Sequence, residues 1–450
     1  MLVIHDDLNL VHQIDDLKRR ATNILTEAQR KNVTSAEVFV SVSKGLSTAV
    51  HQANVETVQY HYHKHLTVTV YFGFQTGTAS TNDLSETSIA KTIQAACDIA
   101  KYTATDENNG LADAHLMATH FPDLSLYHPC VLSQEQLIEQ ALICEEAAIA
   151  SNPRQLQSNS AKSNLGESIT VYANSHGFVG HRIGSSYSLG CNVIARKNDD
   201  MQRDHWYTVA RRFEDLESAS AVGQHAAQRV LQRLDAKTVV TNTYPIIFNA
   251  QVATSLLGHF IQAISGHQLY RQMSFLHDSL EKQVFSSCVN ISENPYLPKG
   301  WGSSTFDNEG VCPQQRDIVS QGVVKGYVLN SYSARKLGMQ TTGNAGGVHN
   351  LTLASTVDDL PALLRQMDTG ILVTELMGMG INLVTGDYSR GMAGFWVEGG
   401  EIQYPIQEVT IAGNLADMFQ DIQAIGNDLE TRGNIRTGSI LIEKMTVAGK

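Results

Sequence analysis

The sequence predicts an α+β protein of two domains, in which antiparallel sheets are combined with helices. The chain has 450 residues, 42% of them hydrophobic, which is more than a single core needs. The order helix, strands, helix occurs twice in the first half of the chain, whereas glycine becomes dense and the elements shorten from about residue 237. We therefore expect an N-terminal α+β domain at residues 1–236 and a C-terminal β-rich domain at residues 237–450.

The first repeat begins with an amphipathic helix at residues 10–30, where apolar residues recur at steps of three and four. Alternating, β-branched segments then predict strands at residues 36–42, 46–50, 55–60 and 66–72. Gly45 and Asn54 are interpreted as the breaks between these strands. A second helix is expected to begin at about Thr87.

The same order returns in residues 132–234. A helix is expected at residues 133–150 and another at 218–234, with strands between them at 168–172, 186–195 and 206–210. The hairpin at residues 47–58 is loosely similar to residues 169–179. This favours a duplication of residues 10–103 in residues 132–234, and a chance likeness of two hairpins is the alternative.

The C-terminal domain is expected to be a curved, barrel-like antiparallel sheet with central helices. Helices fit residues 251–265 and 360–367, and Asp359 is a candidate N-cap for the second. Short strands are expected at residues 244–248, 323–329, 370–376, 394–397 and 408–412.

Charge and composition exclude several classes of function. The formal net charge is −12, which argues against a surface for nucleic acid or anionic lipid. No segment approaches the roughly 20 apolar residues of a membrane helix. The six cysteines lie far apart and form no CxxC pair, so we expect reduced thiols and a cytoplasmic protein.

The common catalytic motifs are absent from the sequence. No histidine is followed by glutamate, so the HExxH zinc helix is missing. The G-x-S-x-G elbow of hydrolases and the Walker phosphate loop are missing as well. Residue types and spacing alone therefore define no active site.

One row of histidines could bind a metal ion. His61, His63 and His65 alternate along a predicted strand and would share one face, roughly 6.5–7 Å apart. Zinc requires all its ligands about 2 Å from one ion, so a third histidine in such a row reaches it poorly. We expect a solvated polar face here, with an adventitious surface metal site as the alternative.

Three further features allow two interpretations each. His259 lies on an apolar helix and is either a core histidine or a ligand. Residues 385–391, TGDYSRG, form either a tight hairpin turn or a loop that binds a ligand, because glycines let the backbone turn and approach closely. Residues 341–347 are expected to form a flexible glycine-rich loop.

Many segments, in order, resemble the PmbA (TldE) branch of the TldD/PmbA family. The likeness runs nearly end to end. The segments that carry it are STNDLS (80–85), FDNEGV (306–311), SYSARKLG (331–338), TGNAGG (342–347), TELMG (374–378), TGDYSRG (385–391), GFWVE (394–398), TIAGNL (410–415) and GNDLE (426–430).

The resemblance implies a peptidase family in which the TldD partner carries a zinc helix of the form H-E-x-x-x-H and a distal cysteine. In this chain Thr254 and Ser255 stand at the first His and the Glu, and only His259 matches. The cysteine position falls near Thr437. One imidazole cannot supply the three protein ligands of a catalytic zinc, and a hydroxyl cannot replace the carboxylate base. No metal bound by this chain is therefore expected.

The resemblance also implies partners. A TldD-type subunit would complete a heterodimer and hold the zinc, the isolated chain could form a homodimer, and the substrates would be unfolded peptides such as antibiotic leader peptides and a small antitoxin. The residues expected to line the cleft are His259, Asn344, Asp387, Tyr388, Ser389 and Arg390. Pairing of Arg390 with Asp387 is the alternative role for that arginine.

Two other functions are weighed against this one. The first is a self-sufficient metallohydrolase that uses His61, His63 and His65. The second is a module that binds DNA gyrase or DNA directly, in line with the older family label of modulator of DNA gyrase. The acidic charge of the chain gives that second function no support.

Overall fold

The computed structural model describes residues 10–449, which fold into two compact units. The first consists mainly of residues up to Val230 and the second mainly of residues from Leu231 onward. The predicted α+β class is confirmed, with largely antiparallel sheets in both units. Among the described residues no helix is long and apolar enough to cross a membrane.

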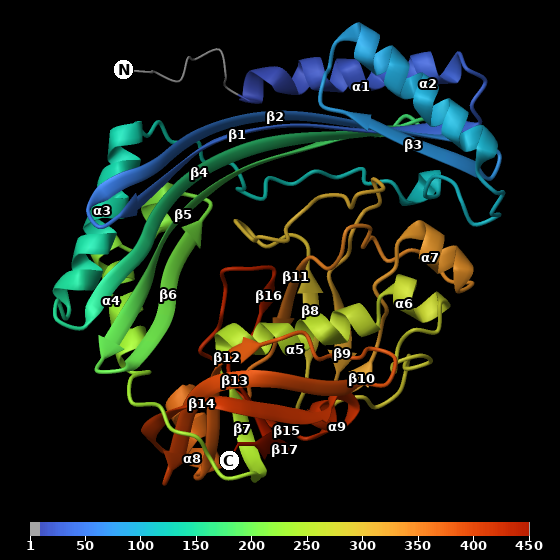
Figure 1. Cartoon of the computed structure of the whole chain (residues 1–450). Coiled ribbons are helices and arrows are strands. Elements are labelled where there is room, and N and C mark those ends of the chain that lie inside the picture. Colours follow the sequence, from blue (N-terminus) through green and yellow to red (C-terminus); the bar gives the residue numbers. More distant parts are fainter. Residues whose placement is uncertain (1–9, 450) are drawn as a thin grey trace. The chain divides into compact units, whose positions relative to one another are not determined.

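The first unit is one antiparallel sheet with the strand order β3-β2-β1-β4-β5-β6 and with helices at both ends (Figure 1). Each half runs from a helix through three strands to a second helix. The elements of the first half are η2 (Leu10–Gln13), α1 (Ile14–Gln29), β1 (Ser35–His51), β2 (Asn54–Phe72), β3 (Gln75–Thr81) and α2 (Glu86–Tyr102). After η3 (Ala114–Leu116) come α3 (Gln134–Ala150), β4 (Leu156–Asn174), β5 (Val179–Lys197), β6 (Asp200–Ala210), η4 (Phe213–Asp215) and α4 (Ala219–Leu231).

The sequence suggested that Gly45 is a break between two strands. In the structure it lies inside the long strand β1. It is paired with His61 of β2 on one side and with Gly166 of β4 on the other. A Cβ atom at this position would lie 2.3 Å from Cε1 of His61. The glycine is therefore needed because the imidazole of His61 covers it, and a local pattern cannot reveal such a cross-strand contact.

The segment Ser304–Pro313 belongs to the first unit, although it lies within the predicted second domain. Phe306 is fully buried, and its ring centroid lies 5.3 Å from that of Phe178. Arg182 stacks on Phe306 and donates a hydrogen bond to Asn308. A single boundary at residue 236 therefore does not describe this segment, which lies late in the sequence but belongs to the first unit. Only its long-range packing assigns it there.

The second unit contains a closed barrel and a smaller sheet. The barrel comprises β7 (Asn242–Phe248), β12 (Gly370–Met377), β13 (Asp387–Glu398), β14 (Glu401–Asn414) and β17 (Ile440–Ala448), and pairing of β14 with β17 closes it. The smaller sheet comprises β8 (Ile291–Asn294), β9 (Arg316–Ser320), β10 (Val323–Val324), β11 (Asn350–Leu353) and β16 (Ile435–Arg436). Strand β15 (Ile422–Ile425) pairs with β17.

Helix α5 (Ala250–Ala263) is the central helix of this unit (Figure 1). Its buried residues Leu256, Leu257 and Phe260 belong to the same core as Ile291 of β8 and Ile371 of β12. Helix α5 therefore brings the smaller sheet and the barrel into one core. The other helices are α6 (Gly266–Tyr270), α7 (Ser331–Lys336), α8 (Leu360–Met367) and α9 (Leu415–Gln420).

The turn between β1 and β2 is held by a buried carboxylate from helix α3. Glu145 is 4% exposed, and its two oxygens accept the backbone N–H groups of Gln52 at 2.9 Å and Ala53 at 2.7 Å. Both turn residues have positive φ angles, of 51° and 59°. The carboxylate thus satisfies two donors of a turn that is intrinsically strained for residues with side chains.

We predict that Glu145→Ala lowers the free energy of unfolding by about 3 kcal/mol, because two charge-assisted hydrogen bonds are lost. Chemical denaturation measures this change. The neighbouring Glu146 is exposed, so Glu146→Ala is a matched control and should change stability by less than about 0.5 kcal/mol. Equal effects of the two substitutions would show that the carboxylate does not hold the turn.

Candidate functional site

The site is built on helix α5, which begins at the N-cap Asn249, whose side chain accepts the N–H of Val252. The hydroxyl of Thr254 donates to the carbonyl oxygen of Gln251 at 2.8 Å. That of Ser255 donates to the carbonyl oxygen of Val252 at 2.7 Å. Both hydroxyls therefore satisfy backbone groups of their own helix, as is usual for Ser and Thr within helices.

His259 follows Ser255 by four residues and lies on the same face of α5. It is half-buried, and its Nε2 atom has no hydrogen-bond partner in residues 10–449. Burial, together with the nearby positive charge of Arg390, lowers the pKa of His259. The ring is consequently held in its neutral form.

Thr437 is fully buried directly after strand β16, and α5 packs against this strand. Its hydroxyl donates to the carbonyl oxygen of Gly438 at 2.9 Å. Among the described residues, no group of three or more His, Cys, Asp or Glu side chains could hold a metal ion. His259 is thus the one strong zinc ligand at the positions compared with the metal motif, and the donor set does not fit zinc.

The sequence left residues 385–391 open between a tight hairpin turn and a ligand-binding loop. In the structure Thr385 and Gly386 precede strand β13, which begins at Asp387 and pairs with β14. The alternation of the strand divides the predicted cleft residues between two faces. Asp387 and Ser389 are exposed, whereas Tyr388 is buried and Arg390 half-buried on the other face. Tyr388 reaches His259, with ring centroids 6.2 Å apart in an edge-to-face arrangement.

Asp387 does not pair with Arg390, which was the alternative role considered for the arginine. Its carboxylate accepts a hydrogen bond from the hydroxyl of Thr385 at 2.6 Å and a longer one from Nδ2 of Asn414 at 3.4 Å. These contacts join the beginning of β13 to the end of β14, which are paired at Asp387 and Asn414. The aspartate therefore supports the end of the hairpin on its exposed face.

The inner face of β13 carries polar atoms without partners. Within the described part of the chain, the hydroxyl of Tyr388 and Nε of Arg390 are buried and make no hydrogen bond of normal geometry, as is also true of Nε2 of His259. Burial raises the pKa of Tyr388 to about 12, although the charge of Arg390 opposes this rise. The group therefore consists of a neutral imidazole, a neutral phenol and one guanidinium cation.

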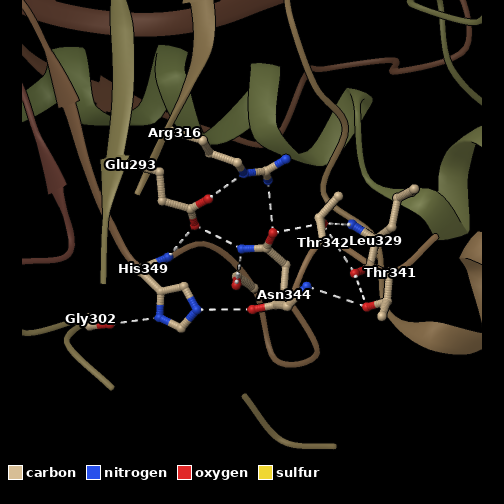
Figure 2. Close-up of polar contacts among 10 residues, drawn as sticks. Glu293, Gly302, Arg316, Leu329, Thr341, Thr342, Asn344 and His349 are labelled. Carbon is tan, nitrogen blue, oxygen red and sulfur yellow. Dashed lines mark hydrogen bonds and ion pairs between the residues drawn. The ribbon is translucent and has the colours of Figure 1, made fainter. Parts of the chain in front are cut away.

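Asn344 lies elsewhere in the same unit, in a buried polar network (Figure 2). Its Nδ2 donates to Glu293 at 2.7 Å, and its Oδ1 accepts from Arg316 at 2.8 Å and from Thr342 at 2.7 Å. The amide is thus fully engaged, and no free group is left for the predicted contact with a ligand. We assign Asn344 to holding the glycine-rich loop at residues 341–347 in place.

Glu293 is the centre of this network and is 1% exposed. It accepts from Nε of Arg316 at 3.0 Å and from the backbone N–H of His349 at 2.7 Å, besides Asn344 (Figure 2). Glu293 and Arg316 were not singled out in the sequence. A glutamate at an inward position of the short strand β8 is the one local signal, and nothing local identifies its partner on β9.

His349 joins two glycine-containing segments. Its Nδ1 lies 3.0 Å from the carbonyl oxygen of Gly302, and its Nε2 lies 3.0 Å from that of Gly343. Each ring nitrogen thus lies within hydrogen-bond distance of a backbone carbonyl oxygen. The glycine-rich loop at residues 341–347 is therefore fastened by both Glu293 and His349.

The histidine row on β2 shows a different arrangement from a metal site. The rings of His61 and His63 stack, with centroids 5.7 Å apart. Both ring nitrogens of His65 have polar neighbours, Asn82 at 3.1 Å and Thr67 at 3.0 Å. The row therefore consists of a stacked pair and a third histidine held by neutral side chains.

Comparisons with known proteins agree with the resemblance seen in the sequence. Family models of PmbA/TldA metallopeptidases match three segments: domain 1 at residues 36–100, the central domain at 127–234 and the C-terminal domain at 241–449. A metalloprotease PmbA homolog of Haemophilus influenzae is 46% identical over 432 residues, which is 96% of each chain. The metalloprotease PmbA of Escherichia coli O157:H7 is 45% identical over 92% of each chain.

Solved structures share the fold. A protein of Bacteroides thetaiotaomicron described as a modulator of DNA gyrase superposes with a TM-score of 0.93 at 28% identity, covering 97% of this chain and 100% of that one. TldE of Thermococcus kodakarensis has a TM-score of 0.83 at 18% identity, covering 96% of this chain and 100% of its own.

The sequence is also similar to the other branch of the family. A TldD homolog of Haemophilus influenzae is 21% identical, over 91% of this chain and 88% of that protein.

We predict that Glu293→Gln lowers the free energy of unfolding by about 3–5 kcal/mol, because it leaves Arg316 without its buried counter-ion. Denaturant unfolding measures the change. The ion pair of Glu281 with Lys325 is exposed at both side chains, so Glu281→Gln is a matched control with an expected cost below about 1 kcal/mol. A small effect at both positions would mean that the buried network does not stabilise the unit.

Proposed function

Because the chain belongs to the PmbA/TldA metallopeptidase family, we propose that it is the TldE-type subunit of a zinc peptidase whose metal is held by a TldD-type partner. The observation that carries the proposal is the donor set on and near α5. Thr254, Ser255 and Thr437 offer hydroxyls that already donate to backbone carbonyls, and His259 lies beside a cation. Such a group cannot assemble three ligands around zinc.

The proposed substrates are unfolded peptides, such as leader peptides of peptide antibiotics and a small antitoxin. The family resemblance supports this substrate class, and extended peptides are bound elsewhere by main-chain pairing that reads little sequence. Within this proposal, His259, Tyr388 and Arg390 face the peptide. Asp387 and Ser389 are on the opposite face of β13, so their contacts would be with other partners of the subunit.

The proposal assigns no role in binding DNA. The description as a modulator of DNA gyrase belongs to the Bacteroides protein, and a formal net charge of −12 is unfavourable for contact with phosphates. The six cysteines, all among the described residues, form no disulfide with one another. Unpaired thiols suit a reducing compartment, so we place the proposed complex in the cytoplasm.

The proposed partnership is with a TldD-type chain in a heterodimer, and the isolated chain would form a homodimer through the same surface. The existence of both TldD and TldE homologues among the matching proteins supports this arrangement.

The test combines a metal assay with a cleavage assay. The purified chain should contain no stoichiometric zinc by mass spectrometry, and it should cleave a disordered peptide only after the TldD-type protein of the same organism is added. In the mixture, Ser255→Ala should leave cleavage unchanged, because the Ser255 hydroxyl is bound to its own helix. Cleavage by the isolated chain that a chelator abolishes would overturn the proposal.

A further inference from the structure

Arg390 carries a positive charge, and no carboxylate of residues 10–449 forms an ion pair with it. It projects from β13 onto the face that also bears Tyr388, and it is half-buried. Its Nε has no hydrogen-bond partner in residues 10–449. By contrast, Arg316 of the same unit is paired with a carboxylate at 3.0 Å. A half-buried cation without a counter-ion is partly desolvated, so a ligand that compensates the charge of Arg390 would be stabilised there.

The neighbours of Arg390 provide hydrogen-bond donors and no negative charge. The charge that acts on both His259 and Tyr388 is that of Arg390, and no carboxylate of the described chain contributes to the pKa shift of either residue. Guanidinium and phenol groups donate, and a neutral imidazole donates from one ring nitrogen. A ligand that only accepts hydrogen bonds would therefore satisfy the group.

We propose that Arg390, Tyr388 and His259 form a binding site for a carboxylate of a peptide ligand. The planar guanidinium binds carboxylates in a bidentate manner, and the phenol and imidazole of its neighbours supply further donors. A metal cation would be repelled by Arg390. At the position where the resemblance places a zinc helix in the TldD partner, this chain thus offers an anion site.

The charge of the site selects a carboxylate over a phosphate group. The group has one formal positive charge, which balances one carboxylate. A phosphate monoester carries about −1.5 to −2 at neutral pH and would remain undercompensated. The anion site is argued from the buried, unpartnered atoms of His259, Tyr388 and Arg390, whereas the assignment of a peptide as its carrier rests on the proposed function.

The first experiment uses the isolated full chain and a short, N-terminally labelled peptide of alanine and glycine, followed by fluorescence anisotropy. The peptide with a free C-terminal carboxylate should bind at least about tenfold more tightly than its C-terminal amide. Arg390→Gln should remove this difference. Arg365 is an exposed arginine of α8, and the control Arg365→Gln should bind like the native chain.

A third peptide, amidated but with one internal glutamate, identifies the source of the carboxylate. Tight binding that requires Arg390 would support the site with a side-chain carboxylate as its ligand. Equal binding of all three peptides, or binding that Arg390→Gln leaves unchanged, would overturn the proposal.

A second measurement keeps the proposal testable if none of these peptides binds. Acetate alone should shift the Nε–H resonance of Arg390 in a saturable manner in a ¹⁵N-arginine NMR spectrum, where the Arg390→Gln spectrum assigns the signal. Absence of a saturable shift together with absence of peptide binding would overturn the proposal.

Thermal unfolding separates a binding role from a structural one. Since Arg390 forms no ion pair within residues 10–449 and its Nε has no hydrogen-bond partner there, Arg390→Gln should change the melting temperature by less than about 2 °C. Tyr388→Phe keeps the ring against His259 and removes a hydroxyl without a partner, so it should be equally neutral. A loss of many degrees in Arg390→Gln would show that Arg390 is part of the structural framework.

Discussion

The charge of Arg390 beside His259 is the interaction on which the account of this protein depends. The guanidinium lies on β13 and the imidazole on α5, and both residues are half-buried in the second unit. The charge of Arg390 disfavours a protonated His259, and a nearby cation likewise opposes binding of a metal ion. Helix α5 of this metallopeptidase-family chain thus carries a histidine whose pKa is lowered by burial and by the charge of Arg390.

The buried network around Glu293 gives the same unit its fixed loops. Its carboxylate compensates Arg316, and the amide of Asn344 and the backbone of His349 complete its shell. A network in which each polar group is satisfied can make a glycine-rich loop rigid. The contrast with Arg390 is informative, because both arginines are half-buried in the same unit, yet Arg316 has a carboxylate partner and Arg390 forms no ion pair within residues 10–449.

Local sequence patterns predicted helices and most strands because these depend on periodicity and capping. Helix α8 begins and ends where the pattern indicated, with Asp359 as its N-cap. The same patterns failed where a contact comes from far along the chain. Gly45 was predicted to be a break because glycine often interrupts strands. The ring of His61 that covers it belongs to another strand, so the local pattern could not reveal this contact. The assignment of Ser304–Pro313 to the first unit and the ion pair of Glu293 with Arg316 were also missed, because both depend on contacts between distant parts of the chain.

The candidate site was partly predicted. The motif at residues 385–391 drew attention to Tyr388 and Arg390, but the sequence did not indicate that strand alternation separates them from Asp387 and Ser389. Such a division follows once the segment is known to be a strand. His259 was left open between core residue and ligand, and its neighbours in space favour a role in binding.

The most direct measurement of the central claim is a pH titration of the His259 ring by ¹H–¹⁵N NMR in the native chain and in Arg390→Gln. We predict that the pKa of His259 lies below its ordinary value in the native chain, because of burial and the charge of Arg390. We also predict that this pKa rises in the variant, where burial remains and the charge is gone. An ordinary pKa in the native chain, or one that does not respond to loss of Arg390, would contradict the account.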